Sequence, residues 1–215
     1  MHNKSKEGKK MYQNIVYDFD GTISDTYPIF TKALLVLMER HGMKGDYDEC
    51  YALLKISVGA AIRHFDWGVE DIKIIQREFH EIHDAMALEE QKPYDDAEEI
   101  LRYAVERGKK NYLYTHTDTL AYRLLEKWGL RHYFTDAIDG SMDFPRKPAP
   151  DALLYLMEKN HMNPAETLMV GDRDIDIDAG HNAGAAGCLY DYEGFYTDTR
   201  ADHFVQKLAD IKAIL

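Results

Sequence analysis

Two hydrophobic patterns divide this chain. Short apolar runs with β-branched or aromatic residues alternate with amphipathic stretches near the N-terminus and again after residue 92, and this alternation predicts strands separated by helices. Strands joined by helices favour right-handed crossovers, so the predicted fold class is α/β with a mainly parallel sheet. The strands are expected at residues 15–17, 111–115, 134–138, 167–170 and 187–190, with a short edge strand at 204–205.

The stretch from residue 25 to residue 92 has a helical pattern throughout. Its apolar residues recur three and four positions apart, and the Lys92–Pro93 pair interrupts the run because a proline disfavours helical geometry in the residue before it. The clearest apolar stripe consists of Ile72, Ile75, Phe79, Ile82 and Met86. We therefore expect residues 11–24 and 93–215 to form an α/β domain, with residues 25–92 as a helical insertion.

Single residues indicate where several helices begin. Asp25 is expected to cap a helix that starts near Pro28, and Asp95 to cap the helix that follows the insertion. Thr117 or Asp118 is expected to cap the next one. Further helices are predicted at residues 151–159, 176–183 and 209–215.

Composition narrows the classes of function. The 215 residues are 45% hydrophobic, which is enough for a buried core, and the formal net charge is −12. An acidic surface does not favour nucleic acid or an anionic membrane as a partner. A small anionic ligand can still bind where a metal ion and a lysine reverse the local field.

The sequence favours a cytoplasmic protein. Cys50 and Cys188 lie far apart, which argues against a disulfide framework or a zinc site. Residues 1–10 are polar and basic without an apolar stretch behind them, which is typical of a disordered tail and not of a signal peptide. No apolar run approaches the ~20 residues that cross a bilayer. Nothing in the sequence specifies an oligomeric state.

Two aspartates follow the first predicted strand. In Tyr17-Asp18-Phe19-Asp20-Gly21-Thr22 the chain leaves the strand at Gly21, and strand ends of this kind are the usual place for a site in an open α/β sheet. Two neighbouring carboxylates repel each other and need a proton or a cation. The pair suits a nucleophile and a general acid/base beside a divalent metal. Taken alone, it fits a strand end with two solvated acids equally well.

Three later stretches bring further polar groups to the same region. Thr115 ends the second predicted strand, and Asp172 follows the strand at 167–170. Lys147 lies in Lys147-Pro148-Ala149-Pro150, where prolines restrict the loop, and would supply a positive point charge. Because the carboxyl ends of parallel strands share one edge, these side chains are expected to converge.

The run Asp172-Arg173-Asp174-Ile175-Asp176 also has the spacing that begins a calcium-binding loop. That loop requires glycine at its sixth position and glutamate at its twelfth. Ile177 and Ala183 occupy these positions, so the calcium interpretation fails.

In this order, the four stretches resemble the motifs of the haloacid dehalogenase-like hydrolases, in the branch of phosphoglycolate phosphatases and β-phosphoglucomutases. The resemblance runs from about Ile15 to the C-terminus. It implies a Rossmann-like three-layer core with an inserted α-helical cap. It also implies a phosphoric monoester hydrolase, acting on a small phosphorylated metabolite with Mg²⁺ as cofactor.

The resemblance implies the following catalytic roles. Asp18 would attack phosphorus and form an aspartyl-phosphate, which splits one difficult displacement into two easier ones. Asp20 would protonate the leaving oxygen and then deprotonate the attacking water. Thr115 would donate its hydroxyl hydrogen to a phosphoryl oxygen, and Lys147 would supply positive charge to the phosphoryl group and the nucleophile.

The resemblance also implies the metal ligands. Mg²⁺ would bind Asp18, the backbone carbonyl of Asp20 and Asp172, while Asp176 would orient the waters on the metal.

Two residues are candidates for substrate contacts. His116 stands where the family often has asparagine, next to Thr115, and could alter the contacts with the substrate. Arg63 is the permanent cation of the segment 57–63 in the insertion, and could bind a remote anionic group of the substrate.

Two other functions remain as alternatives. Phosphomutases share all four motifs, but their cap loop usually carries an arginine flanked by acids, which the segment 57–63 lacks, so a hydrolase is favoured. A non-enzymatic signalling domain that accepts phosphate on aspartate also combines an aspartate, a hydroxyl, a lysine and Mg²⁺. Such domains have neither the helical insertion nor the second acid at Asp20. Dehalogenases also lack this second acid.

Overall fold

The computed structural model describes residues 12–215, so the tail predicted at residues 1–10 lies outside the described part of the chain. The chain forms two compact units. One unit comprises the residues up to Ile23 together with Tyr94–Leu215, and the other comprises Ser24–Pro93. Within residues 12–215, none of the helices has the length and apolar character needed to cross a bilayer.

The first unit is built on a six-stranded sheet within the described residues, ordered β3-β2-β1-β4-β5-β6. Its strands are β1 (Asn14–Tyr17), β2 (Lys110–Tyr114), β3 (Phe134–Ile138), β4 (Thr167–Gly171), β5 (Ala186–Tyr190) and β6 (His203–Val205). All the strand pairings of this sheet are parallel. The predicted α/β class is confirmed, and the strand order is that of the doubly wound Rossmann fold.

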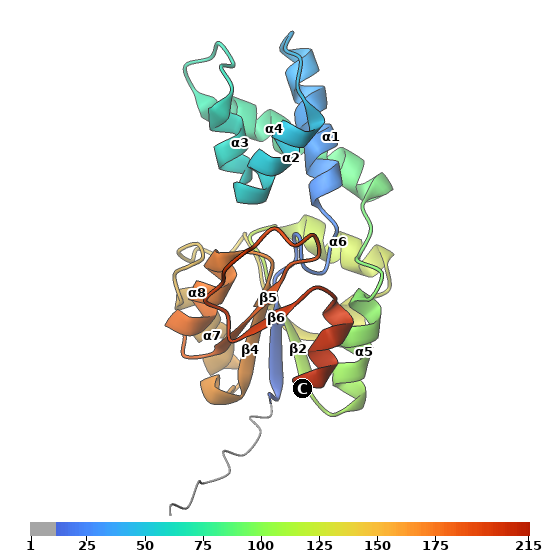
Figure 1. Cartoon of the computed structure of the whole chain (residues 1–215), viewed down its shortest axis with the longest axis vertical. Helices are drawn as coiled ribbons and strands as arrows, with labels where there is room; N and C mark the ends of the chain where they lie inside the picture. Colours follow the sequence, from blue (N-terminus) through green and yellow to red (C-terminus); the bar gives the residue numbers. More distant parts are fainter. Residues whose placement is uncertain (1–11) are drawn as a thin grey trace, which may run out of the picture. The chain divides into compact units, whose positions relative to one another are not determined.

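Helices cover both faces of this sheet. Figure 1 shows α7 (Asp151–Lys159) and α8 (Asp174–Asn182) on one side, with α5 (Ala97–Glu106) and the C-terminal 3₁₀-helix (Leu208–Ala213) on the other. The remaining elements are α6 (Thr119–Lys127) and two short 3₁₀-helices, Arg131–Tyr133 and Pro164–Glu166. The core is therefore three-layered, as expected.

Alternation along the strands decides which side chains reach which layer. Val16, Tyr112 and Met169 belong to one buried cluster with apolar residues of α7 and α8. The backbone N–H of Asp18 donates to the carbonyl of Val170 at 2.8 Å, so the ladder between β1 and β4 continues to Asp18. With a period of two, Asp18 points to the same side as Val16, toward α8.

Buried tyrosines fill much of this sheet. Tyr17, Tyr112, Tyr114 and Tyr190 are among the largest fully buried side chains of the described residues. Burial raises the pKa of the first three above the ordinary tyrosine range, which keeps their hydroxyls protonated. Part of the chain's set of fifteen tyrosines thus has a packing role, with rings that supply large apolar area.

The second unit, residues 24–93, is described in full and consists of four helices. These are α1 (Tyr27–Arg40), α2 (Tyr47–Ile56), α3 (Val58–His64) and α4 (Ile72–Glu90). Ile75, Phe79 and Ile82 of the predicted stripe are buried in one core cluster, while Ile72 and Met86 pack against it. Near the two ends of the unit, Gln91 Nε2 donates to Ser24 Oγ at 2.6 Å.

Two predicted helix caps are wrong. Helix α1 starts at Tyr27, and its N-cap is Thr26 and not Asp25. Helix α5 has Asp96 and not Asp95 at its N-cap, without a side-chain capping bond. The carboxylate of Asp96 instead accepts the N–H of Ala209, 2.9 Å away and distant in sequence, so a tertiary contact has replaced the local cap.

Other element ends differ by a few residues. Of the two candidates for capping α6, Asp118 forms the bond, accepting from the N–H of Leu120 at 3.3 Å. Helix α8 begins at Asp174, before the predicted start at Asp176. The last segment is a 3₁₀-helix that ends at Ala213.

Candidate active site

The strand order reverses direction between β1 and β4. In open parallel sheets, ligands bind beyond the carboxyl ends of the strands, at the point where the strand order reverses direction. Asp18 directly follows β1 and Asp172 directly follows β4. Thr115 follows the neighbouring strand β2, and its backbone N–H donates to the carbonyl of Ile138 at 3.0 Å. Three of the predicted site residues therefore share one edge of the sheet.

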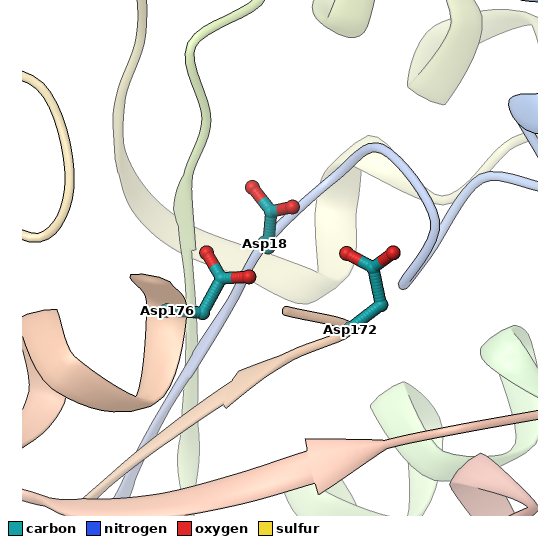
Figure 2. A group of neighbouring side chains, drawn as sticks. All are labelled: Asp18, Asp172 and Asp176. Atoms are coloured by element: carbon teal, nitrogen blue, oxygen red, sulfur yellow. The ribbon is translucent and has the colours of Figure 1, made fainter. Parts of the chain in front are cut away.

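Three carboxylates form a buried cluster at this edge. Each of Asp18, Asp172 and Asp176 offers a carboxylate oxygen, and these oxygens lie within 4.8 Å of one another. The exposed fractions of these residues are 3%, 2% and 0%. Figure 2 shows the side chains side by side, coming from β1, β4 and the first turn of α8. The structure thus brings together Asp18 and Asp172, which the sequence predicts as metal ligands, and Asp176, which it predicts beside the metal.

Lys147 is buried inside this cluster. Its Nζ lies 2.6 Å from Asp18 Oδ1 and 2.8 Å from Asp176 Oδ1, and it donates to the carbonyl of Tyr114 at 2.8 Å. The same ammonium lies 4.4 Å from the centre of the Tyr114 ring, within range of a cation–π interaction. Burial lowers the pKa of Lys147, but the carboxylates of Asp176 and Asp18 outweigh burial, so the net shift is upward and the side chain stays charged.

The cluster holds more negative than positive charge. Burial is the largest cause that raises the pKa of Asp18 to about 7, with Lys147 opposing it and Asp176 and Asp172 adding to it. Even with the guanidinium of Arg173, whose Nε lies 3.9 Å from Asp172 Oδ1, three buried acids outnumber the two cations. Such an excess of buried negative charge is costly unless a further cation joins it.

The donor set fits a hard divalent cation. Asp18 Oδ2 is buried and has no hydrogen-bond partner among the described residues, and such an orphaned oxygen is costly unless a ligand satisfies it. Carboxylate oxygens are the ligands that Mg²⁺ prefers. The three carboxylates therefore fit a divalent cation at this edge of the sheet.

Local structure explains the position of Asp176. It is the third residue of α8, and its Oδ2 accepts the backbone N–H of Arg173 at 3.1 Å, where the helix dipole also favours an acid. A Cβ on Gly171 would lie 2.2 Å from the Cβ of Asp176. Glycine at the end of β4 therefore allows Asp176 to pack against the strand.

Asp20 lies in the turn after β1 and is half-buried. Its Oδ2 accepts the hydroxyl of Thr117 at 2.6 Å, and the N–H of Thr117 donates to Thr115 Oγ1 at 3.0 Å. Thr117 is a functional candidate that the sequence analysis treated only as a helix cap. The sequence signal for its role is its position two residues after Thr115, at the same strand end.

The two candidate substrate contacts lie in different surroundings. His116 is half-buried, and its Nε2 accepts the backbone N–H of Lys147 at 3.1 Å, a contact that the sequence analysis did not predict. Arg63 lies in α3 of the helical unit and is exposed. A Cβ on Gly59 would lie 3.1 Å from Nη1 of Arg63, so the guanidinium lies along its own helix. The role of Arg63 in binding substrate stays a prediction.

Comparison with known proteins decides the family. The sequence profile of the haloacid dehalogenase-like hydrolases matches residues 15–189. The chain belongs to this family. The resemblance predicted from the four motifs is thus confirmed.

Curated relatives of this haloacid dehalogenase-like hydrolase are named as phosphatases. It is 45% identical over 71 residues to a phosphoglycolate phosphatase of Vibrio vulnificus, a match that covers 32% of the chain and 31% of that protein. The match thus spans about a third of the length of that relative. The fructose-1-phosphate phosphatase YqaB of Escherichia coli is 27% identical over 182 residues, covering 80% of the chain and 93% of that protein.

Solved structures show the same fold. A hydrolase from Streptococcus pneumoniae has a TM-score of 0.65 at 31% identity, covering 83% of the chain and 92% of that protein. A predicted phosphoglycolate phosphatase from Haemophilus somnus has a TM-score of 0.82 at 22% identity, covering 96% and 99%. At that identity, the second comparison supports the fold alone.

Proposed function

We propose that this hydrolase is a magnesium-dependent phosphatase that hydrolyses a small phosphorylated metabolite through an aspartyl-phosphate on Asp18. One observation carries the proposal: the Lys147 ammonium lies 2.6 Å from Asp18 Oδ1 inside a buried cluster with Asp172 and Asp176. Phosphoryl transfer depends mostly on positioning and on neutralising charge. A fixed nucleophile beside a fixed cation meets both requirements.

Asp18 is the proposed nucleophile. One of its oxygens contacts Lys147, while the other has no hydrogen-bond partner within residues 12–215. A bound Mg²⁺, held by Asp18, Asp172 and the backbone carbonyl of Asp20 with Asp176 beside it, would neutralise the oxygens of the phosphoryl group. The hydroxyl of Thr115 accepts from Thr117, which leaves its hydrogen to donate to a phosphoryl oxygen.

Asp20 is the proposed general acid and base. Its half-buried carboxylate comes two residues after the nucleophile, and the hydroxyl of Thr117 fixes one of its oxygens. It would protonate the leaving oxygen in the first step and take a proton from water in the second.

The two units are proposed to have different functions. We assign the catalytic core to residues 11–24 and 93–215, and a cap that selects the substrate to residues 25–92. The named activities of the relatives support a small phosphorylated acid or sugar as the substrate class. The cytoplasm remains the proposed location.

The structure disfavours the signalling alternative. Receiver domains that accept phosphate on aspartate have the strand order 2-1-3-4-5, whereas the order here is 3-2-1-4-5-6. The phosphomutase alternative shares the fold, but the segment 57–63 has no acid beside Arg63. A hydrolase therefore remains the favoured reaction.

The test of the proposal is phosphate release from a generic aryl phosphate. We expect the purified chain to release phosphate with Mg²⁺, to lose that activity when a chelator removes the metal, and to regain it when Mg²⁺ is restored. Activity that survives complete chelation would contradict metal dependence, and a well-folded chain with no release from any phosphorylated sugar or acid would contradict a phosphatase.

Replacing Arg63 tests the proposed cap. If its guanidinium binds a remote carboxylate or second phosphate, Arg63→Ala should lower kcat/KM for the physiological substrate by ~10–100-fold, the worth of a charge-assisted hydrogen bond. A small aryl phosphate makes no such contact and should react unchanged. Steady-state kinetics on both substrates checks this. An equal loss on both would indicate general damage to the helical unit, and no loss would make Arg63 a surface residue.

A further inference from the structure

The imidazole of His116 is held in one tautomer. A backbone N–H can only donate, so the 3.1 Å contact with the N–H of Lys147 requires an unprotonated Nε2 on His116. A neutral imidazole then carries its hydrogen on Nδ1. Burial, followed by the charges of Lys147 and Arg146, lowers the pKa of His116 to about 3, which keeps the ring neutral and able to accept this hydrogen bond.

The end of β2 and the residues after it bind both the side chain and the backbone of Lys147. The carbonyl of Tyr114 accepts its Nζ at 2.8 Å, and the ring of His116, two residues later, accepts its backbone N–H. The Tyr114 and His116 rings meet edge to face, with centroids 6.1 Å apart. The lysine is therefore fixed at its charged tip and at its backbone from the same strand end.

The loop between β3 and α7 needs such an anchor. It contains Lys147 but has no regular secondary structure at this point. At its start, the N–H of Gly140 donates to the carbonyl of Thr117 at 3.2 Å. A Cβ on Gly140 would lie 2.1 Å from the carbonyl oxygen of His116, so the loop packs directly on the backbone of His116. Both ends of this loop segment thus contact the residues that follow β2.

We propose that His116 is a positioning residue, which fixes the Lys147 loop so that the ammonium stays between Asp18 and Asp176. This inference rests on the proposed function and adds a structural role at a position where substrate contact was expected. The Lys147 contacts of 2.6 and 2.8 Å leave little room for displacement. A shift of about 1 Å in a catalytic group can cost about 100-fold in rate.

His116→Ala and His116→Gln form the test pair. Alanine removes the acceptor, whereas glutamine carries its amide oxygen the same number of bonds from Cβ as Nε2 and can restore it. His132→Ala is the matched control, because His132 is exposed and belongs to the short 3₁₀-helix Arg131–Tyr133. Nitrogen NMR of the imidazoles reports the tautomer, and hydrogen exchange of the Lys147 amide reports the bond without any assay of activity.

The expected result has three parts. In the unaltered chain, His116 shows a protonated Nδ1 and a bare Nε2. In His116→Ala, the Lys147 amide exchanges at least ~10-fold faster and kcat falls ~10–100-fold with little change in KM. His116→Gln restores most of the protection of the Lys147 amide and most of kcat. His132→Ala changes neither the amide exchange nor kcat.

Unchanged exchange of the Lys147 amide in His116→Ala, or a glutamine variant no better than alanine, would overturn the proposal. The two NMR measurements decide it even if the chain releases no phosphate. An absence of phosphatase activity can thus be distinguished from an absence of the hydrogen bond between His116 and Lys147.

Discussion

Asp18→Asn is expected to abolish phosphatase activity, with kcat falling by at least about 10⁴-fold, on the scale seen when an enzyme loses its nucleophile. Asparagine keeps the shape of the side chain but has no carboxylate to attack phosphorus. It also removes one of the charged oxygens that fit the metal. Initial rates of phosphate release with excess Mg²⁺ give the measurement.

The variant should remain folded, because the partners of Lys147 are redundant. Removing one member of a buried ion pair usually costs several kcal/mol, since the other charge is left unpaired. Here Lys147 keeps Asp176 at 2.8 Å and the carbonyl of Tyr114 at 2.8 Å. The thermal unfolding midpoint should therefore stay close to that of the unaltered chain.

Asp174→Asn is the matched control for Asp18→Asn. Asp174 also lies at the start of α8, but it is half-buried and outside the three-acid cluster, so its loss should leave most of the activity. When the reaction of the unaltered chain is quenched with acid during turnover, mass spectrometry should find one phosphoryl group on Asp18. Substantial turnover by a folded Asp18→Asn variant would contradict the covalent mechanism.

The convergence at the sheet edge could be predicted because it depends on local rules. Asp18, Thr115 and Asp172 each follow a short apolar run, and parallel strands bring their carboxyl ends to one edge. Right-handed crossovers then decide which face of the sheet each connecting helix covers. These rules need only the hydrophobic pattern and the position of each polar residue relative to it.

The contacts that could not be predicted join residues far apart in the chain. The bond between His116 and Lys147 spans 31 positions, and that between Thr117 and Asp20 spans 97. Both depend on how loops pack once the sheet has formed, and no periodicity encodes that. The same holds at the start of α5, where the carboxylate of the N-cap residue Asp96 accepts the N–H of Ala209, 113 positions away, and not an N–H of its own helix.

The early start of α8 has a related cause. The alternating acids of residues 172–176 give no clear local signal for a helix start. In the structure the carboxylate of Asp176 turns back to the N–H of Arg173, which adds the preceding residues to the helix. The same turn places Asp176 beside Lys147, so a site contact and a helix start share one side chain.

Asp20→Asn is expected to slow the reaction by about 10²–10⁴-fold, the usual contribution of a general acid or base. The loss should depend on the leaving group. An alkyl phosphate needs its leaving oxygen protonated, whereas an aryl phosphate with an acidic phenol needs this much less. Single-turnover rates on the two substrates, with formation of the aspartyl-phosphate as the measured step, isolate the acid role.

Variants of Thr117 test the same role of Asp20 with a smaller expected effect. Its hydroxyl donates to Asp20 Oδ2 at 2.6 Å, so Thr117→Val removes the donor while keeping the side-chain volume, and Thr117→Ser keeps the donor. Thr117→Val should show a smaller loss than Asp20→Asn, again larger for the alkyl phosphate, because the acid remains but is less well oriented. Thr117→Ser should be close to the unaltered chain. If Asp20→Asn slows alkyl and aryl phosphates by the same factor, Asp20 does not protonate the leaving group, and its bond with Thr117 has only a structural role.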